Sequence, residues 1–219
     1  MMAHPAAWLG IVALGFFHGI NPGMGWLFAV SNGMQEKRSA GVLKALPPLA
    51  FGHFLAMAAI LLPVAALQLA ITHQSRLRVG AAVLLMVFGI YKLLHPRHPR
   101  YMARIGPSRL TLWSFLMATA HGAGLMLIPI FLIISNGAAR VDLQGHTGVS
   151  AFGTIAESGM GIALLSVLLH TLAMIVTAGV IAWLVYRYLG LRLLQKTWFN
   201  LDLLWAVVLI VVGVIALVI

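Results

Sequence analysis

Long apolar stretches dominate the chain, and short polar stretches separate them. A helix needs about 20 apolar residues to cross a hydrocarbon core about 30 Å thick. On this basis we predict membrane-spanning helices at residues 7–31, 44–71, 77–94, 110–137, 158–188 and 199–219. The pattern therefore predicts an all-α integral membrane protein with six transmembrane helices, and the lipid bilayer is its first expected partner.

Composition supports this fold class and excludes several functions. The chain is 62% hydrophobic and 8% charged, whereas a soluble domain carries about 25% charged residues. Its mean hydropathy is +1.01. It has no cysteine, which excludes disulfides, thiolate metal sites and thiol redox chemistry. The first residues lack the basic region of a secretory signal, so we expect no cleaved signal peptide.

Basic residues are distributed unevenly between the predicted loops. The first, third and fifth loops hold eleven of the 14 lysines and arginines, and the second and fourth loops hold Arg76, Arg78 and Arg140. Cytoplasmic loops are enriched in Lys and Arg, so we place the odd loops in the cytoplasm and both termini on the opposite side. This bias also explains the net charge of +10, and no motif indicates a nucleic-acid partner.

Two parts of the chain repeat each other around their histidines. One begins at His18-Gly19 and ends at Ser31-Asn32-Gly33; the other begins at His121-Gly122 and ends at Ser135-Asn136-Gly137. Downstream, His53 and Met57 correspond to His170 and Met174. A weaker match relates residues 83–90 to residues 207–214, aligned on Gly89 and Gly213.

The repeat predicts the organisation of the chain. Residues 1–94 form a first three-span repeat, residues 95–109 form a cytoplasmic linker, and residues 110–219 form a second three-span repeat. Because three spans are an odd number, the second repeat must insert upside down relative to the first. Inverted repeats of this kind are typical of secondary transporters, whose sites lie at the repeat interface.

The first span carries a helix-breaking sequence. Pro22 follows His18 by four residues and is flanked by Asn21 and Gly23, and a proline inside a helix removes a hydrogen bond and clashes with the preceding turn. We therefore predict a kink or an unwound segment near the middle of the membrane. Gly15, Gly19 and Gly23 are spaced four residues apart and predict a close helix contact. The alternative is a packing kink without a ligand.

Four histidines lie inside predicted spans, where ionisable groups usually face the interior. They are His18, His53, His121 and His170, and their repeated positions favour a shared functional site over four separate packing roles. Imidazole and thioether groups bind borderline and soft metal ions. The further candidate ligands are Asn21, Met24, Met57, Met126 and Met174, although methionine also fills gaps in apolar cores.

Acidic residues are scarce and lie near the span ends. They are Glu36, Asp142, Glu157 and Asp202. No interior pair exists for general acid–base catalysis, so we do not expect an enzyme. Calcium and magnesium sites also need carboxylates. The remaining histidines lie in predicted loops or tails, where His95 and His98 are candidates for ion capture.

The sequence His18-Gly19-Ile20-Asn21-Pro22-Gly23-Met24 resembles the first-span motif His-Gly-Leu-Glu-Pro-Gly-His of NicO-type nickel/cobalt efflux permeases and their UreH-like relatives. His53 resembles the histidine of their second span. These families belong to the LysE-like transporter superfamily, which implies three-plus-three inverted repeats and a bacterial-type inner membrane. Asn21 replaces the family's acid and Met24 its second histidine, which favours a softer ion or a substrate that is not a metal.

Three functions follow from these observations. The first is a multi-pass secondary transporter of a transition-metal cation of the Ni, Co, Cu or Zn class, bound by the intramembrane histidines. The second is a LysE-like exporter of a small organic solute. The third is a membrane protein in which histidines such as His53 and His170 hold a haem or a metal ion. The exposed apolar faces permit a homodimer.

Overall fold

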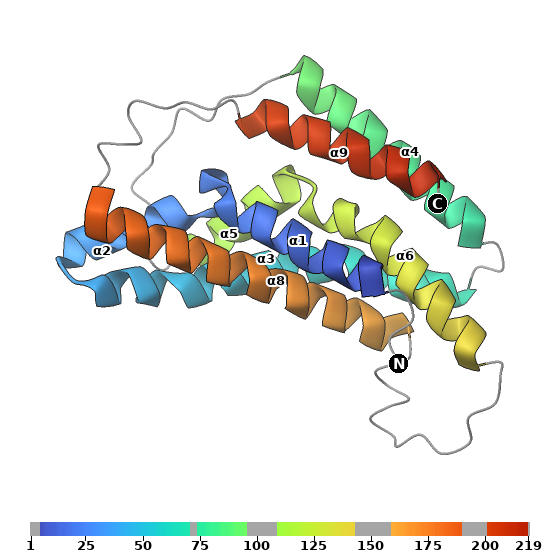
Figure 1. Cartoon of the computed structure of the whole chain (residues 1–219), viewed down its shortest axis with the longest axis horizontal. Coiled ribbons are helices and arrows are strands. Elements are labelled where there is room, and N and C mark those ends of the chain that lie inside the picture. The colour runs from blue at the N-terminus through green and yellow to red at the C-terminus, as the bar shows by residue number, and fades with distance from the viewer. Residues whose placement is uncertain (1–4, 71–73, 96–108, 143–158, 190–200, 219) are drawn as a thin grey trace.

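The computed structural model describes residues 5–70, 74–95, 109–142, 159–189 and 201–218 (Figure 1). These ranges are almost entirely helical and contain no strand, so the predicted all-α class is confirmed for the described part of the chain. Most of the predicted linker at residues 95–109 and of the predicted loop after residue 142 lies outside the described residues.

The helix bounds follow the predicted spans closely. The elements are α1 (Pro5–Ile20), a 3-10 turn η1 (Pro22–Met24), α2 (Trp26–Glu36), α3 (Ser39–Ala70), α4 (Gln74–Leu94), α5 (Leu110–Ala120), α6 (Ala123–Asp142), α8 (Gly159–Leu184), a π-helical turn η3 (Val185–Leu189) and α9 (Leu201–Val218). The first predicted span is divided into α1, η1 and α2. The fourth is divided into α5 and α6.

Some of these helices are long and apolar enough to cross a membrane. Within the described residues, Ser39–Leu67 and Gly159–Leu189 meet this requirement, and the bent pair Leu110–Ala120 and Ala123–Ser135 makes a third if it forms one span. Pro5–Ile20, Val79–Leu94 and Ala206–Val218 are apolar but shorter. The helices are thus compatible with a membrane protein, and the count of six spans stays a prediction.

The outer face of α8 supports a lipid environment. Leu168, Leu172, Val176 and Val180 follow one another at intervals of four residues, and each is between 48% and 59% exposed. Residues at this spacing lie on one face of a helix. A continuous exposed apolar stripe is unusual on a soluble monomer and marks a surface that contacts lipid or another protein.

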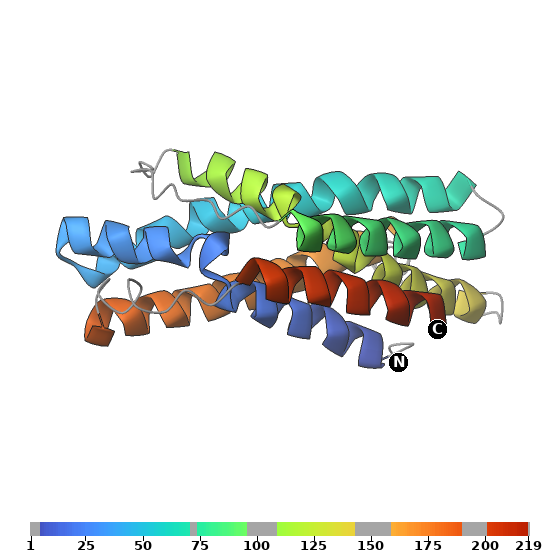
Figure 2. The same ribbon diagram turned by 90° about the horizontal axis from the view of Figure 1, so that it is seen from above.

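The helices run along the long axis of the molecule in alternating directions (Figures 1 and 2). Helices α1, α2 and α4 run in one direction, and α3 runs in the opposite direction. In the second half the pattern is reversed: α5, α6 and α9 run in the direction of α3, and α8 runs in the direction of α1. Helix α8 packs against α1 and α3, and α3 packs against α5. Helices α4 and α9 pack against each other along one side.

The break predicted near Pro22 is present. Helix α1 ends at Ile20, and the Asn21 side chain caps η1 by accepting a hydrogen bond from the Gly23 N–H at 2.9 Å. The indole N–H of Trp26 donates to the Ile20 carbonyl at 3.0 Å, which satisfies an acceptor at the end of α1. Gly25 has φ +113°, a conformation that residues with side chains rarely adopt, and it is the N-cap of α2.

A second break, which the sequence analysis did not predict, divides α5 from α6. It lies at His121-Gly122, where Gly122 has φ +69° and the two helices are bent by 63°. Proline usually interrupts a helix, but Pro129 lies inside α6. Gly25 and Gly122 are the glycines with positive φ in the described residues, so each of the two interrupted predicted spans carries one.

Small residues allow α1 and α8 to approach closely, as predicted for Gly15 and Gly19. A Cβ atom on Gly15 would lie 2.5 Å from the His170 carbonyl oxygen, and one on Gly19 would lie 2.5 Å from the Met174 carbonyl oxygen. Gly23 does not share this contact, because it lies in η1. The contact brings the backbone of α1 directly against the turn of α8 that carries His170.

Helices α4 and α9 contact each other reciprocally. A Cβ atom on Gly89 would meet the Ala206 carbonyl and the Ile210 side chain, and one on Gly213 would meet the Ala82 carbonyl and the Met86 side chain. Ala206 lies 124 positions after Ala82, and Ile210 lies 124 positions after Met86. Gly213 lies the same number of positions after Gly89. The two glycines aligned in the sequence therefore make equivalent contacts.

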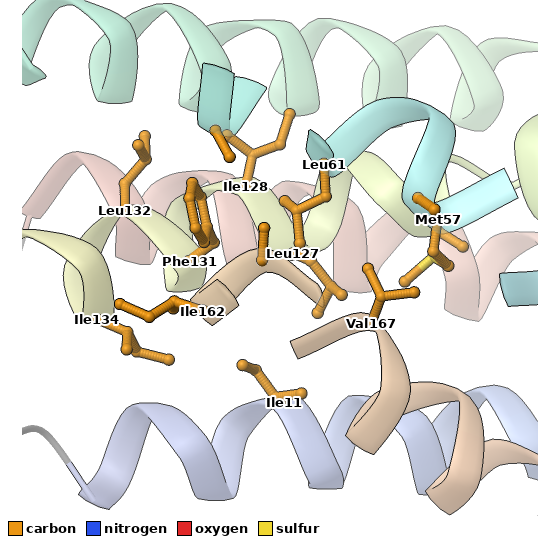
Figure 3. Packing of buried hydrophobic residues seen from close by; sticks show 14 of the residues in the cluster. Ile11, Met57, Leu61, Leu127, Ile128, Phe131, Leu132, Ile134, Ile162 and Val167 are labelled. Atoms are coloured by element: carbon orange, nitrogen blue, oxygen red, sulfur yellow. The ribbon is translucent and has the colours of Figure 1, made fainter. Parts of the chain in front are cut away.

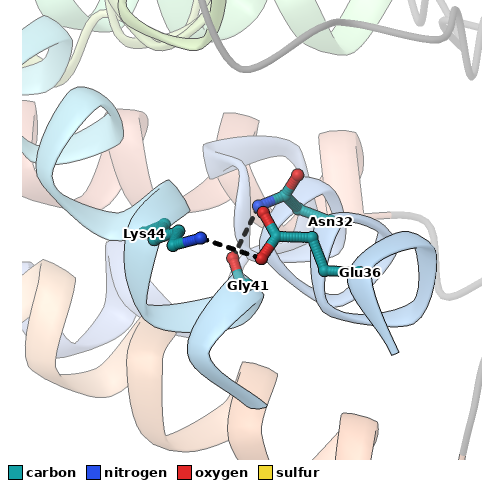
Figure 4. Close-up of polar contacts among 4 residues, drawn as sticks. All are labelled: Asn32, Glu36, Gly41 and Lys44. Carbon is teal, nitrogen blue, oxygen red and sulfur yellow. Dashed lines mark hydrogen bonds and ion pairs between the residues drawn. The ribbon is translucent and has the colours of Figure 1, made fainter. Parts of the chain in front are cut away.

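A tight corner joins α2 to α3 (Figure 4). The Asn32 amide donates to the Gly41 carbonyl at 2.6 Å, and the Lys44 ammonium pairs with the Glu36 carboxylate at 3.1 Å. This exposed pair is worth about 0–1 kcal/mol. The corner fixes the start of α3, the helix that carries His53.

The largest hydrophobic cluster lies between α1, α3, α6 and α8 (Figure 3). Ile11 comes from α1, Met57 and Leu61 from α3, Phe131 from α6 and Val167 from α8. Met57 and Val167 lie within one turn of His53 and His170 respectively. The cluster therefore packs the same helices that present those two histidines.

Candidate functional site

Three of the predicted histidines lie in contact with one another inside the molecule. His18 comes from α1, His53 from α3 and His170 from α8, and each is 0% exposed. The ring centroids are 4.7 Å apart for His18 and His170, 5.6 Å for His18 and His53, and 5.5 Å for His53 and His170. Helices from both predicted repeats thus contribute to one imidazole cluster, which we call the three-histidine cluster.

Backbone carbonyls orient two of these rings. The Nδ1 of His18 lies 2.8 Å from the Leu14 carbonyl oxygen, and the Nδ1 of His170 lies 3.2 Å from the Ile11 carbonyl oxygen. A carbonyl oxygen only accepts hydrogen bonds, so Nδ1 carries the hydrogen in both rings. The lone pair of each neutral ring is then on Nε2, which is the arrangement found in metal-ligating histidines.

His53 is held differently. Among the described residues, neither of its ring nitrogens has a hydrogen-bond partner, and the same is true of Nε2 in His170. Leaving a buried polar group without a partner costs about 1–3 kcal/mol. A cation or another polar ligand at this position would remove that penalty.

The fourth histidine, His121, lies at the break between α5 and α6. Its Nδ1 donates to the Met117 carbonyl at 2.7 Å. A Cβ atom on Gly23 would lie 3.8 Å from both Cε1 and Nε2 of His121, so the ring approaches the break of the first span. His121 is 7% exposed.

The three-histidine cluster has the spacing of a metal centre but not its closed geometry. Imidazole nitrogens bind Zn²⁺ at about 2.0–2.1 Å, which places two rings on a tetrahedral ion with centroids about 5 Å apart. The observed separations lie around that value. Nevertheless, in the ranges that the structure describes, no three His, Cys, Asp or Glu side chains converge as ligands of one ion.

The predicted methionine ligands lie in apolar clusters. Met57 packs in the cluster of Figure 3, and Met174 packs with residues of α2, α3 and α5. Met24 and Met126 pack together with Leu85 and Leu209. These contacts are those of core side chains. Asn21, the other secondary candidate, is 6% exposed and caps η1.

The charged and peripheral groups lie apart from the three-histidine cluster. Glu36 pairs with Lys44, and the His95 ring stacks on Tyr91 at 4.7 Å, where it is exposed. Residues outside the described ranges include His4, His73, His98, His146 and Glu157, and the side chains of Asp142 and Asp202 are also undescribed.

Sequence reasoning missed the backbone acceptors of the site. The carbonyls of Leu14 and Met117 each lie four residues before a histidine at a helix end, so a histidine preceding a glycine-marked break is the signal that points to them. The Ile11 carbonyl reaches His170 from another helix, and no local signal identifies it. Thr171 was also missed: among the described residues its buried hydroxyl has no hydrogen-bond partner.

Comparison of this chain with protein-family models, with curated proteins and with solved structures finds no match.

Proposed function

We propose that this protein is a multi-pass membrane transporter that binds a transition-metal cation at the three-histidine cluster. The observation that carries the proposal is the contact of three wholly buried imidazole rings, which come from three different helices. Imidazole suits zinc, copper, nickel and iron. An intramembrane group of this kind is by default a functional site.

The inverted repeat that the sequence predicts supports a transport function. The alternating helix directions, the two broken spans and the reciprocal glycine contacts of α4 and α9 are each expected of two repeats with opposite orientation. In transporters of this architecture the site lies between the repeats, next to discontinuous helices. His18 and His121 lie at such discontinuities, so rocking of one repeat against the other would change the surroundings of the site.

The packing favours a small ion over a haem. A haem between His53 and His170 would have to extend beyond the two rings in every direction of its plane. His18 contacts both of those rings, at centroid distances of 5.6 and 4.7 Å. Inserting the macrocycle would therefore require α1 to leave its glycine-mediated contact with α8.

The packing also favours an ion over an organic solute. The rings contact one another directly, and all three are wholly buried. A groove of about 410 Å³ between α3 and α8 lies on another part of the surface, and its walls are apolar side chains such as Leu46, Ile175 and Val180. It offers space for lipid chains and no hydrogen bonds to a polar solute.

Metal binding by the full-length protein in detergent micelles tests the proposal. Protein stripped with chelator is titrated with Ni²⁺ and Zn²⁺ by calorimetry, and the bound metal is counted by elemental analysis. We expect one ion per chain, and at least a hundredfold weaker binding in His170→Ala. His95→Ala is the matched control, because His95 is exposed and stacks on Tyr91.

Uptake of the bound ion by proteoliposomes then tests transport. Retention of wild-type affinity in His170→Ala, or absence of metal binding by the wild type, would contradict the proposal. Binding of a small organic solute by metal-free protein would support the exporter of organic solutes instead.

A further inference from the structure

Two of the histidines occupy equivalent places in the two halves of the chain. The Nδ1 of His18 donates to Leu14 at 2.8 Å, and the Nδ1 of His121 donates to Met117 at 2.7 Å. His121 and Met117 each lie 103 positions after their counterparts. His18 lies in the last turn of α1, and His121 directly follows the last turn of α5. A glycine with positive φ lies at each break: Gly25 before α2 and Gly122 before α6.

The helices next to these histidines are paired in equivalent ways. On one side, the Ile11 carbonyl of α1 accepts from His170 on α8. On the other side, Ser114 of α5 lies 103 positions after Ile11, and a Cβ atom on Gly52, the neighbour of His53, would lie 2.9 Å from the Ser114 Cβ. Thus α1 packs on α8 at His170, and α5 packs on α3 at His53.

The two halves differ at these positions, because His18 is part of the three-histidine cluster and His121 is not. His18 contacts both His53 and His170. His121 instead approaches Gly23 at the break of the first predicted span, where a Cβ atom on Gly23 would lie 3.8 Å from both Cε1 and Nε2 of the ring. If the halves exchanged conformations, His121 would take the place of His18 and His18 would take the place of His121.

We propose that His121 replaces His18 as the third ligand in a second arrangement of the same site, while His53 and His170 hold the cation in both. The inference rests on the proposed metal-binding function. It assigns a second ligand set, His53, His121 and His170, to a borderline or soft divalent cation.

A double-mutant cycle with Co²⁺ as a visible probe tests the exchange. Full-length protein in micelles is titrated with Co²⁺, and its absorption reports both affinity and tetrahedral coordination. We expect His121→Ala to bind within about twofold of the wild type, His18→Ala to bind about tenfold more weakly with its tetrahedral spectrum retained, and the double variant to lose at least a further tenfold. His95→Ala is the control.

The outcomes separate the two proposals. Equal affinities for His18→Ala and the double variant would overturn the exchange of ligands while leaving the metal site in place. Failure of the wild type to bind Co²⁺, Ni²⁺ or Zn²⁺ would overturn the proposed function itself. Should His18→Ala aggregate, His18→Asn repeats the cycle, because its amide N–H still reaches a carbonyl acceptor but offers no imidazole lone pair.

Discussion

Individual histidines in this protein differ by what holds their rings. His18, His121 and His170 each use Nδ1 to donate to a carbonyl, whereas among the described residues His53 has no hydrogen bond. A ring fixed by such a bond loses little freedom when Nε2 binds an ion. Among the described residues, packing alone holds the ring of His53.

Substitutions of Asn21 distinguish two possible roles of this residue, a helix cap and a metal ligand. Its side-chain oxygen caps η1, so Asn21→Ala should lower the free energy of unfolding by about 1 kcal/mol. Asn21→Ser, which keeps an acceptor at the cap, should lower it less. Thermal unfolding of the purified protein measures both, and calorimetric titration with Ni²⁺ accompanies it. Loss of metal binding in the serine variant would instead identify Asn21 as a ligand.

Helix boundaries were predictable from the sequence, but one of the two helix breaks was not. Pro22 with its glycines predicted the first break. The second occurs at His121-Gly122 without a proline, while Pro129 is accommodated within α6. A proline changes local hydrogen bonding wherever it occurs. Gly122 only permits a positive φ, and tertiary packing against Phe88 and the other helices decides whether that conformation is used.

The residues of the candidate site could be predicted from the sequence, but their arrangement could not. The repeat selected four histidines, and three of them are in ring contact. The methionines share helix faces with the histidines in sequence, but each packs in an apolar cluster. Helical spacing gives a face, and only the packing of α1, α3 and α8 determines which side chains on that face meet.

The contact between α1 and α8 gives a prediction at the scale of the element. In Gly19→Ala, the new Cβ would lie 2.5 Å from the Met174 carbonyl and 2.6 Å from the Thr177 Cβ. We expect the helices to separate, a loss of about 1–3 kcal/mol in unfolding free energy, and weaker metal binding because His18 moves away from His170. Thermal unfolding and Ni²⁺ titration measure the two effects.

Gly80→Ala on α4 is the matched control for that substitution. Its new Cβ would meet nothing within 4 Å, so the same chemical change should leave metal binding intact and raise stability by about 0.5–1 kcal/mol. Equal behaviour of the two alanine variants would show that the close approach of α1 to α8 does not position the site.

The whole molecule combines a polar interior site with an apolar exterior. The stripe of α8 is exposed, whereas the three histidines are wholly buried. The long helix α3 runs from the α2–α3 corner to the region before α4. Its apolar part, Ser39–Leu67, has 29 residues and spans about 44 Å at 1.5 Å per residue. This exceeds a hydrocarbon core of about 30 Å, so the two ends of α3 should lie on opposite sides of a membrane.

The absence of cysteine in the chain allows this orientation to be measured with single cysteines. Arg38 lies before α3 among the basic residues predicted to be cytoplasmic, and Arg76 lies after α3; both are exposed. In intact cells, a membrane-impermeant maleimide should label Arg76→Cys, and it should label Arg38→Cys only after permeabilisation.

Labelling of both from the same side would mean that α3 does not cross the membrane. The predicted inverted repeat would then lose its geometric basis, because each half would no longer contain three spans. Labelling of Arg38→Cys alone in intact cells would retain the spans and reverse the orientation that the basic loops predict.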